Sequence, residues 1–429
     1  MLLLTVPVAV SLYSLSGDKR PDQADVSLLE RESRASFDFF WREANTNLGS
    51  PGYGLIRDRA PGNPDISSVA SVGFGLTALA IAAERGWVTR GEAYDRALGT
   101  LDTLLYRAEH EHGFFYHFLM MNDGSRAGAS EVSIIDTALA LNGALTAGEY
   151  FQGEVAVLAE RLYRRVEWPW YRDPERNQFY MSWSPEYGFR GAWDYYAEQL
   201  SVYLLAAASP THPTAPDLFY GFAREERTYG DGEPFIHSWF GSLFTHQFSH
   251  AWFDFRGLTD KEGVDWWRNS VAASAASRQF AIDQAAIYPS LGARAWGFTA
   301  SDGPRGYEGR YGSAPSGTSD NEHFVDGTVP PAGAAGSIVF TPEATLAALR
   351  YYDTLPALKG PYGFKDAFNL ETDPAWYDED VIGIDKGITL LMFENYRSGF
   401  VWKHYMSNKF VQRGAKLVGL KEKGDQHAD

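Results

Sequence analysis

Apolar residues recur with a helical period along most of this chain. The first apolar stripe combines Leu28, Leu29, Phe37, Phe40 and Trp41 with charged residues on the opposite side. Later stretches repeat the pattern and predict helices over 69–84, 92–108, 134–151, 154–166, 198–208, 263–285, 341–352 and 387–396. The chain is therefore predicted to be all-α, with around a dozen helices.

The segments between these helices are long and rich in glycine, proline, aspartate and aromatic residues. They cover 49–66, 168–191, 209–234, 288–336 and 358–383. Loops longer than about 15 residues in a compact domain are usually functional. No linker, low-complexity block or repeat divides the chain. We therefore predict one domain over 27–420 with a polar tail at 421–429, built as an (α/α)6 toroid with its loops on one face. An α-solenoid is the alternative, but it lacks a repeat period.

Composition narrows the possible partners. The 429 residues are 45% hydrophobic and 22% charged, which is sufficient for a large core. With 38 basic and 55 acidic side chains the net charge is −17, which argues against nucleic acid or an anionic membrane surface as the main partner. The absence of cysteine excludes disulfides, thiolate nucleophiles and cysteine-ligated metals. The 13 tryptophans and 24 tyrosines suit a sugar-binding cleft as well as a core.

The N-terminal segment 1–17 resembles a secretory signal. Its apolar run, 1–13, is too short to span a membrane, which takes about 20 residues. Small residues follow the run, as at a cleavage site, although no lysine or arginine precedes it. We expect export to the periplasm or beyond; a buried N-terminal strand is the alternative.

Common catalytic motifs are missing. Neither GxGxxG nor GxxxxGK[ST] opens a helix after a strand, so nucleotide binding has no support. Neither HExxH nor GxSxG is present, which sets aside zincins and α/β-hydrolases.

Three carboxylates stand where long loops meet apolar helices. They are Asp136, Glu198 and Asp385. Each could simply cap its helix or interact with the helix dipole. Their recurrence favours convergence on one rim, and a glycoside hydrolase needs two such groups, an acid and a base or nucleophile.

Aromatic and polar loop residues provide candidates for binding a sugar. The predicted substrate-binding residues are Arg57, Tyr116, Trp183, Trp193, Tyr195, His246, His250, Asp254, Arg256, Trp296 and Asp302. The i, i+4 pair His246 and His250 could bind a metal, but no third ligand accompanies it, so hydrogen bonding to substrate or core is predicted. The acidic segment 320–326 lacks EF-hand spacing and is predicted to be a solvated loop. No metal is predicted.

Several strings resemble the glycoamylase-like glycoside hydrolases, a group that includes bacterial endo-β-1,2-glucanases. They occur in consistent order between 28 and 420: SVGFGLTALAIAAERGW (71–87), SIIDTALAL (133–141), EQLSVYLLAAASPTHP (198–213), SHAWFDFRG (249–257), WGFTASDGPRGY (296–307), TPEATLAALRYY (341–352), GIDKGI (383–388) and ENYRSGFVWK (394–403). The resemblance implies an (α/α)6 barrel, an inverting reaction on β-1,2-glucan, an oligo- or polysaccharide partner, and no redox or nucleotide cofactor.

The resemblance also assigns roles to the three carboxylates. Glu198 occupies the essential glutamate of an E-x-x-x-x-Y-x-L-A block and is expected to be the general acid. Asp385 matches the GIDxG block and Asp136 the S-x-x-[DE]-T-A block, so either could be the general base. Some relatives have an acidic pair three residues apart, whereas this chain has Ser133 at the first position and Glu131 out of register.

Three hypotheses follow from these residues. The first is a hydrolase of a bacterial β-glucan, most simply β-1,2-glucan, that uses Glu198 as acid. The second, favoured by Ser133, is a transglycosylase or a hydrolase of another linkage. The third is a glycan-binding protein that keeps the cleft but lacks a working base.

Overall fold

The computed structural model describes residues 21–423, so the segment 1–17 lies outside the described residues. The helices are α1 (Gln23–Arg42), α2 (Val69–Glu84), α3 (Arg90–Tyr106), α4 (Ile134–Phe151), α5 (Gly153–Arg165), α6 (Leu200–Ala208), α7 (Phe248–Trp252), α8 (Trp266–Gln284), α9 (Pro331–Ala335), α10 (Pro342–Asp353), α11 (Gly383–Ser398), α12 (Phe400–Ser407) and α13 (Lys409–Val418). Among the described residues, no helix combines the length and apolarity needed to cross a membrane.

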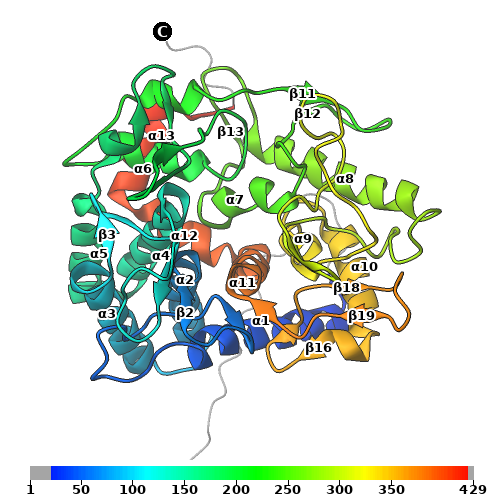
Figure 1. Ribbon diagram of the computed structural model, residues 1–429, viewed down its shortest axis with the longest axis horizontal. Helices are drawn as coiled ribbons and strands as arrows, with labels where there is room; N and C mark the ends of the chain where they lie inside the picture. The colour runs from blue at the N-terminus through cyan, green and yellow to red at the C-terminus, as the bar shows by residue number, and fades with distance from the viewer. Residues whose placement is uncertain (1–20, 424–429) are drawn as a thin grey trace, which may run out of the picture.

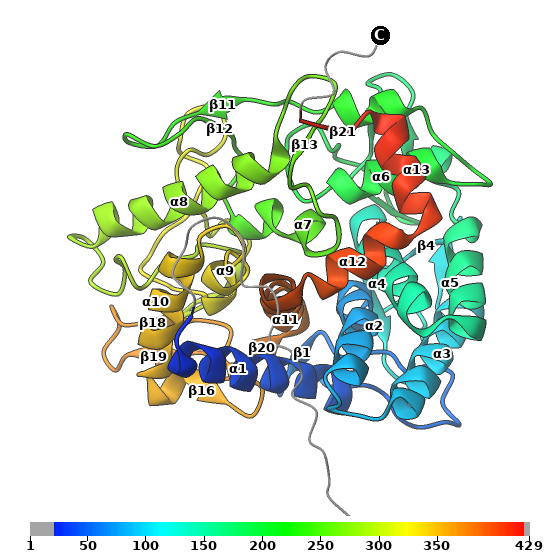
Figure 2. The same ribbon diagram turned by 180° about the vertical axis from the view of Figure 1, so that it is seen from behind.

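The helices form an inner and an outer layer, which alternate along most of the chain; α6 and α7 are successive inner helices, and α13 covers α6 from outside. The inner layer contains α2, α4, α6, α7, α9 and α11, and the outer layer contains α1, α3, α5, α8, α10 and α13. Figure 1 shows α2 and α11 towards the middle with α1, α3, α5, α8 and α10 around them, and Figure 2 shows the same order from behind. All of α6 is buried, whereas α13 buries one stripe, as expected for an inner and an outer helix. The predicted (α/α)6 toroid is confirmed.

Inner helices pack closely because small residues face one another. A Cβ atom at Gly143 of α4 would lie 1.9 Å from the carbonyl oxygen of Gly73 in α2, so any side chain there would push the two helices apart. Buried polar groups join the next helices in the ring. Asn142 donates to Ser201 Oγ of α6 at 3.2 Å and accepts from the Tyr405 hydroxyl of α12 at 2.6 Å. Buried polar groups paired in this way fix the register of the helices around the ring.

The strands are short and lie in the loops. They are β1 (Arg59–Ala60), β2 (Ile66–Ser68), β3 (His110–Glu111), β4 (Phe114–Phe115), β5 (Phe118–Met120), β6 (Val132–Ser133), β7 (Arg172–Asp173), β8 (Gln178–Phe179), β9 (Ser182–Ser184), β10 (Gly188–Arg190), β11 (Glu226–Arg227), β12 (Phe235–Ile236), β13 (Leu258–Thr259), β14 (Ser301–Gly303), β15 (Gly306–Glu308), β16 (Lys359–Gly360), β17 (Gly363–Phe364), β18 (Phe368–Asn369), β19 (Trp376–Tyr377), β20 (Val381–Ile382) and β21 (Lys421–Glu422). The pairs that they form are antiparallel.

Three of these strands lead directly into inner helices. Strand β2 precedes α2, β6 precedes α4, and β20 precedes α11. Each pairs with another loop strand: β2 with β5, β6 with β9, and β20 with β1. The loops are thereby fastened to the amino-terminal ends of the inner helices, which gathers them on one face of the toroid, as predicted.

Candidate active site

Asp136 is the third residue of α4, and it does not cap that helix. The cap is Ser133, whose side-chain oxygen accepts a hydrogen bond from the Asp136 amide at 3.2 Å. The Asp136 side chain is therefore available for other contacts, although its residue is only 7% exposed. The sequence allowed Asp136 to serve simply as a helix cap, but that role belongs to Ser133, three residues earlier.

His117 lies between Asp136 and Glu131. Its Nδ1 is 2.9 Å from Glu131 Oε1, and its Nε2 is 3.8 Å from Asp136 Oδ2. Burial disfavours the imidazolium, but the carboxylates of Asp136, Glu131 and Asp58 outweigh it and raise the pKa of His117 to about 9. His117 is therefore a cation at neutral pH. Its pairing with Asp136, which comes from a different segment, has no local sequence signal.

Glu198 lies two residues before α6, and its backbone is fixed from α7. The Ser249 hydroxyl donates to the Glu198 carbonyl oxygen at 2.7 Å. The neighbouring Gln199, not Glu198, makes the local bonds at the helix start, to the amide of Ala197 and the carbonyl of Tyr195. Burial raises the pKa of Glu198 to about 7, and the charge of Asp136 acts in the same direction. A carboxyl group that keeps its proton near neutral pH is suited to general acid catalysis.

Asp385 is the third residue of α11 and faces another buried carboxyl group, that of Asp366. The two side chains hydrogen-bond to each other, so they share a proton, and burial raises the pKa of both. Asp366 is fixed in turn because its Oδ2 accepts from the Asp302 amide at 2.7 Å. Asp385 Oδ2 and Asp366 Oδ1 are both buried and have no other hydrogen-bond partner among the described residues, as expected if the shared proton lies between the two carboxyl groups.

Further carboxylates surround this pair. Oxygen atoms of Asp302, Asp366 and Asp378 lie within 4.8 Å of one another, an arrangement that could hold a cation. The side chain of Arg59 already supplies positive charge there, with Nη1 2.6 Å from Asp302 Oδ2 and 3.4 Å from Asp380 Oδ2. Of this group only Asp302 was predicted, because its partners lie far away in the sequence.

An exposed aromatic ring borders the same cluster. Tyr307 lies opposite Asp302 in the β14–β15 hairpin and is 55% exposed. Burial of its hydroxyl group and the charge of Asp385 and other nearby carboxylates raise the pKa of Tyr307. An exposed ring whose hydroxyl reaches buried carboxylates is placed to contact a sugar ring, and sequence reasoning missed it.

Two predicted aromatic residues also lie near the amino-terminal ends of the inner helices. Trp183 of β9 pairs with Val132, just before α4, and remains partly exposed. Tyr195 lies three residues before Glu198 and donates to Glu225 Oε2 at 2.6 Å.

Five other predicted substrate-binding residues are buried in the core. Tyr116, Trp193 and Trp296 are 2%, 6% and 1% exposed. His246 and His250 are 2% and 1% exposed, and burial lowers the pKa of both to about 3, so they are neutral core residues. These side chains pack in the interior, and their contact with a substrate stays a prediction.

The remaining three predicted residues bind other protein groups. Asp254 and Arg256 pair at 2.6 Å just after the carboxyl-terminal end of α7, the end opposite the site. The guanidinium of Arg256 also stacks over Trp402 at 4.2 Å. Arg57 pairs with Glu43 at 2.5 Å, which anchors the segment before β1.

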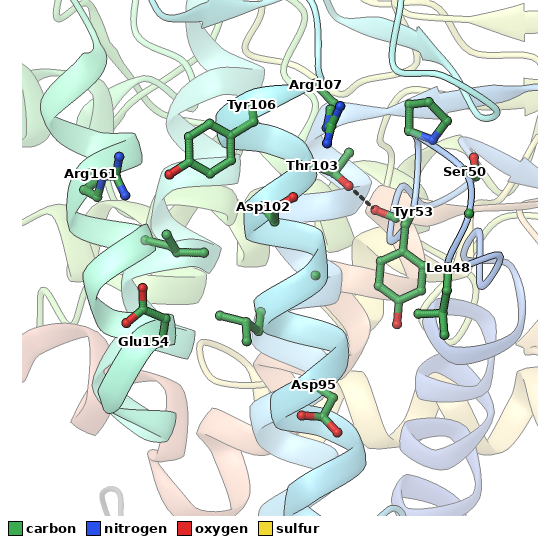
Figure 3. A pocket seen from close by; sticks show the side chains of 15 residues that line it. Leu48, Ser50, Tyr53, Asp95, Asp102, Thr103, Tyr106, Arg107, Glu154 and Arg161 are labelled. Carbon is green, nitrogen blue, oxygen red and sulfur yellow. Dashed lines mark hydrogen bonds between the residues drawn. The ribbon is translucent and has the colours of Figure 1, made fainter.

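A separate depression of about 660 Å³ lies between outer helices α3 and α5. Figure 3 shows Tyr53, Tyr106, Asp102 and Arg161 around it. No residue predicted from the sequence to act in catalysis or substrate binding lines this depression.

Comparison with known proteins identifies the family of this chain. The family model Glycoamylase, described as "Putative glucoamylase", matches residues 191–409. An exo β-1,2-glucooligosaccharide sophorohydrolase (non-reducing end) of Parabacteroides distasonis is 28% identical over 92% of this chain, which spans 58% of that relative's length.

Solved structures are similar over nearly the whole fold. An endo-β-1,2-glucanase of Chitinophaga pinensis, in complex with sophorotriose and glucose, is 29% identical with a TM-score of 0.82, covering 93% of this chain and 99% of that one. A β-1,2-glucanase of Parabacteroides distasonis is 27% identical with a TM-score of 0.81, covering 92% of this chain and 60% of that one. The family match spans more than half of the 429 residues, and the protein therefore belongs to the Glycoamylase family.

Proposed function

We propose that this protein is a glycoside hydrolase that cleaves β-1,2-linked glucan with inversion at the anomeric carbon. The observation that carries the proposal is a half-buried glutamate, Glu198, whose pKa is raised to about 7, on the same face as the proton-sharing pair Asp366 and Asp385. Relatives of known activity that share the fold act on β-1,2-linked glucans, which supports the linkage.

In the proposed reaction Glu198 donates its proton to the glycosidic oxygen as the bond from that oxygen to the anomeric carbon breaks. A water molecule attacks the anomeric carbon from the opposite side and loses a proton to the base, directly or through a sugar hydroxyl. Glu198 is left as a carboxylate and is reprotonated from solvent. The proton count closes without a metal or an organic cofactor.

Of the two candidate bases, Asp385 is the better supported. An inverting base stands about 6.5–9.5 Å from the acid, so that water fits between them. Asp136 is close enough to Glu198 for its charge to act on the acid's pKa, which gives Asp136 the role of keeping the acid protonated. Asp385 belongs to a buried pair of carboxyl groups and can pass a proton to or take one from its partner Asp366, which suits it to the role of base.

The serine at 133 does not require a different reaction. Its hydroxyl caps α4, a sufficient structural reason for a serine at that position. The hypothesis of a changed linkage or transglycosylation, which rested on Ser133, therefore loses its specific support.

A product profile tests the proposal. The purified protein is incubated with linear β-1,2-glucan, cyclic β-1,2-glucan, laminarin and starch, with Glu198→Gln as the matched inactive variant. We expect short oligosaccharides from β-1,2-glucan alone, and an α-anomer as the first reducing end seen by NMR. Sophorose as the sole product would indicate exo attack, and a range of lengths endo attack. Cleavage of another glycan, or no cleavage, would contradict the proposal.

A further inference from the structure

His117 is held rigidly beside the proposed acid and has no role in the reaction described above. Its amide donates to the Glu131 carbonyl at 2.8 Å, and its carbonyl accepts from the amide of Val69 at 3.1 Å. These bonds join the start of α2 to the segment that leads into α4. The imidazole ring stacks on Phe118 with centroids 3.9 Å apart and 15° between planes, which fixes the plane of the ring.

The charged groups around this ring come from three segments. Glu131 lies in the segment before β6, Asp136 on α4, and Asp58 before β1. Arg126, the cation near Glu131, is engaged elsewhere, because it binds Glu186 through two hydrogen bonds of 2.6 and 2.9 Å. Within residues 21–423, His117 is the cationic side chain paired with Asp136.

Each ring nitrogen faces a carboxylate: Nδ1 is hydrogen-bonded to Glu131, and Nε2 forms a longer ion pair with Asp136. Glu131 binds Nδ1 and is itself affected: burial opposes its ionisation, but His117 lowers the pKa of Glu131 overall. The Glu131 hydrogen bond orients the ring so that Nε2 points to Asp136, 3.8 Å away. The Glu131 carboxylate thus orients the His117 imidazolium, and the imidazolium faces the Asp136 carboxylate.

We propose that His117 is a positioning residue, held by Glu131, that orients the Asp136 carboxylate beside the acid Glu198. This inference rests on the proposed function, in which Asp136 keeps the acid Glu198 protonated. The imidazolium also offsets part of the negative charge of Asp136, so it limits how far Asp136 raises the pKa of Glu198.

The proposal predicts a defined change in the pH profile. In His117→Gln the positive charge is lost, Asp136 acts on Glu198 without compensation, and the alkaline limb of kcat/KM moves to higher pH. Misorientation of Asp136 lowers kcat, by on the order of 100-fold for a displacement near 1 Å, with a smaller change in KM. Glu131→Gln keeps an oxygen for Nδ1 and should give an intermediate phenotype.

A matched control is available in His112. Its Nδ1 is also 2.9 Å from a glutamate, Glu167, and its ring also stacks on an aromatic residue, Trp170. It lies outside the proposed site, so His112→Gln should leave kcat and the pH profile unchanged.

The pair can be tested without substrate. The chain has ten histidines, and the NMR signal missing from His117→Gln identifies the ring of His117. Its pKa should be about 9 in the wild type and should fall in Asp136→Asn and in Glu131→Gln.

A wild-type value near the ordinary 6.5, or an unchanged pH profile in both His117→Gln and Glu131→Gln, would overturn the inference. If β-1,2-glucan is not cleaved at all, the proposed function fails while the titration still reports on the pair. If His117→Gln does not fold, Glu131→Gln and the wild-type titration decide the question.

Discussion

The side-chain oxygen of Ser133 accepts a hydrogen bond from the amide of Asp136 at 3.2 Å, so serine caps α4 and the aspartate does not. Ser133 therefore stabilises the start of the helix, and Asp136, three residues later, keeps its side chain for the proposed site. It also explains how a chain without an acidic residue at 133 can keep a carboxylate at 136 free for the site.

The first prediction concerns that cap. Ser133→Ala should lower the free energy of unfolding by about 1 kcal/mol, since the α4 amide loses its acceptor, while activity on β-1,2-glucan stays within a few-fold. Chemical denaturation and initial rates measure the two effects. Ser68→Ala removes the equivalent cap of α2 and serves as a comparison. Loss of activity without loss of stability in Ser133→Ala would assign the serine to the reaction.

The second prediction concerns Glu198→Gln. Loss of the acid should reduce kcat by about 10²- to 10⁴-fold, with binding of glucan retained.

The stability of the Glu198→Gln variant should not fall. A carboxyl group with a raised pKa destabilises the folded state as pH rises above its ordinary pKa of 4.5, so the variant should be more stable than the wild type above pH 7. Each pKa unit corresponds to about 1.4 kcal/mol. Thermal unfolding at pH 5 and pH 8 checks the sign, with the outer-helix variant Glu160→Gln as control; marked destabilisation would make Glu198 a structural residue.

The third prediction is a narrow pH optimum. Activity requires Glu198 protonated and Asp385 ionised. The pKa of Glu198 is raised to about 7, so activity should fall as pH rises past 7. Burial and the contact with Asp366 shape the titration of Asp385, whose raised pKa places the acidic limb above the ordinary carboxyl range. A plot of kcat/KM against pH should be bell-shaped. Full activity at pH 4, or at pH 9, would contradict one of the two assignments.

The fourth prediction separates Asp385 from Asp366. Asp385→Asn should abolish hydrolysis, because the base is lost. Asp366→Asn should keep measurable activity and an acidic limb near that of the wild type, because the protonated Asp366 already donates a hydrogen bond that favours the ionised form of Asp385, and an amide donates one too. Rates across the pH range distinguish the variants. Equal, complete loss in both would show that Asp366 also touches the reacting groups.

Local sequence patterns predicted the fold correctly and placed the three carboxylates at the starts of helices, where the structure has them. The helices predicted over 69–84 and 134–151 coincide with α2 and α4, although these inner helices are buried on nearly every side and not along one stripe. Short helices without a full period, such as α7 and α9, were not predicted. Asp136, Glu198 and Asp385 all lie at the starts of inner helices, where the loops gather.

The rest of the site depends on contacts between distant segments. Arg59 and Asp302 are 243 residues apart, and Asp302 and Asp366 are 64 apart, so no local pattern joins them. The i, i+4 spacing of His246 and His250 does not tell an exposed helix face from a buried one, and both side chains lie in the core.

The last prediction follows from Arg59, which lies among the carboxylates of Asp58, Asp302 and Asp380. Arg59→Gln would leave these groups, and the nearby Asp366 and Asp385, without that positive charge. Removing one partner of a buried ion pair costs about 3–5 kcal/mol, and less where the pair is partly exposed, as here, where the Arg59 side chain is 23% exposed. The loss should be larger at pH 8 than at pH 5, because at pH 5 the raised pKa values of Asp366 and Asp385 keep protons on the cluster. Urea unfolding at both pH values measures it, and Arg59→Lys, which keeps the charge, should recover most of the difference. An equal loss at both pH values would assign Arg59 to packing, whereas the expected pH dependence would show that it offsets the charge of the carboxylates next to the proposed base.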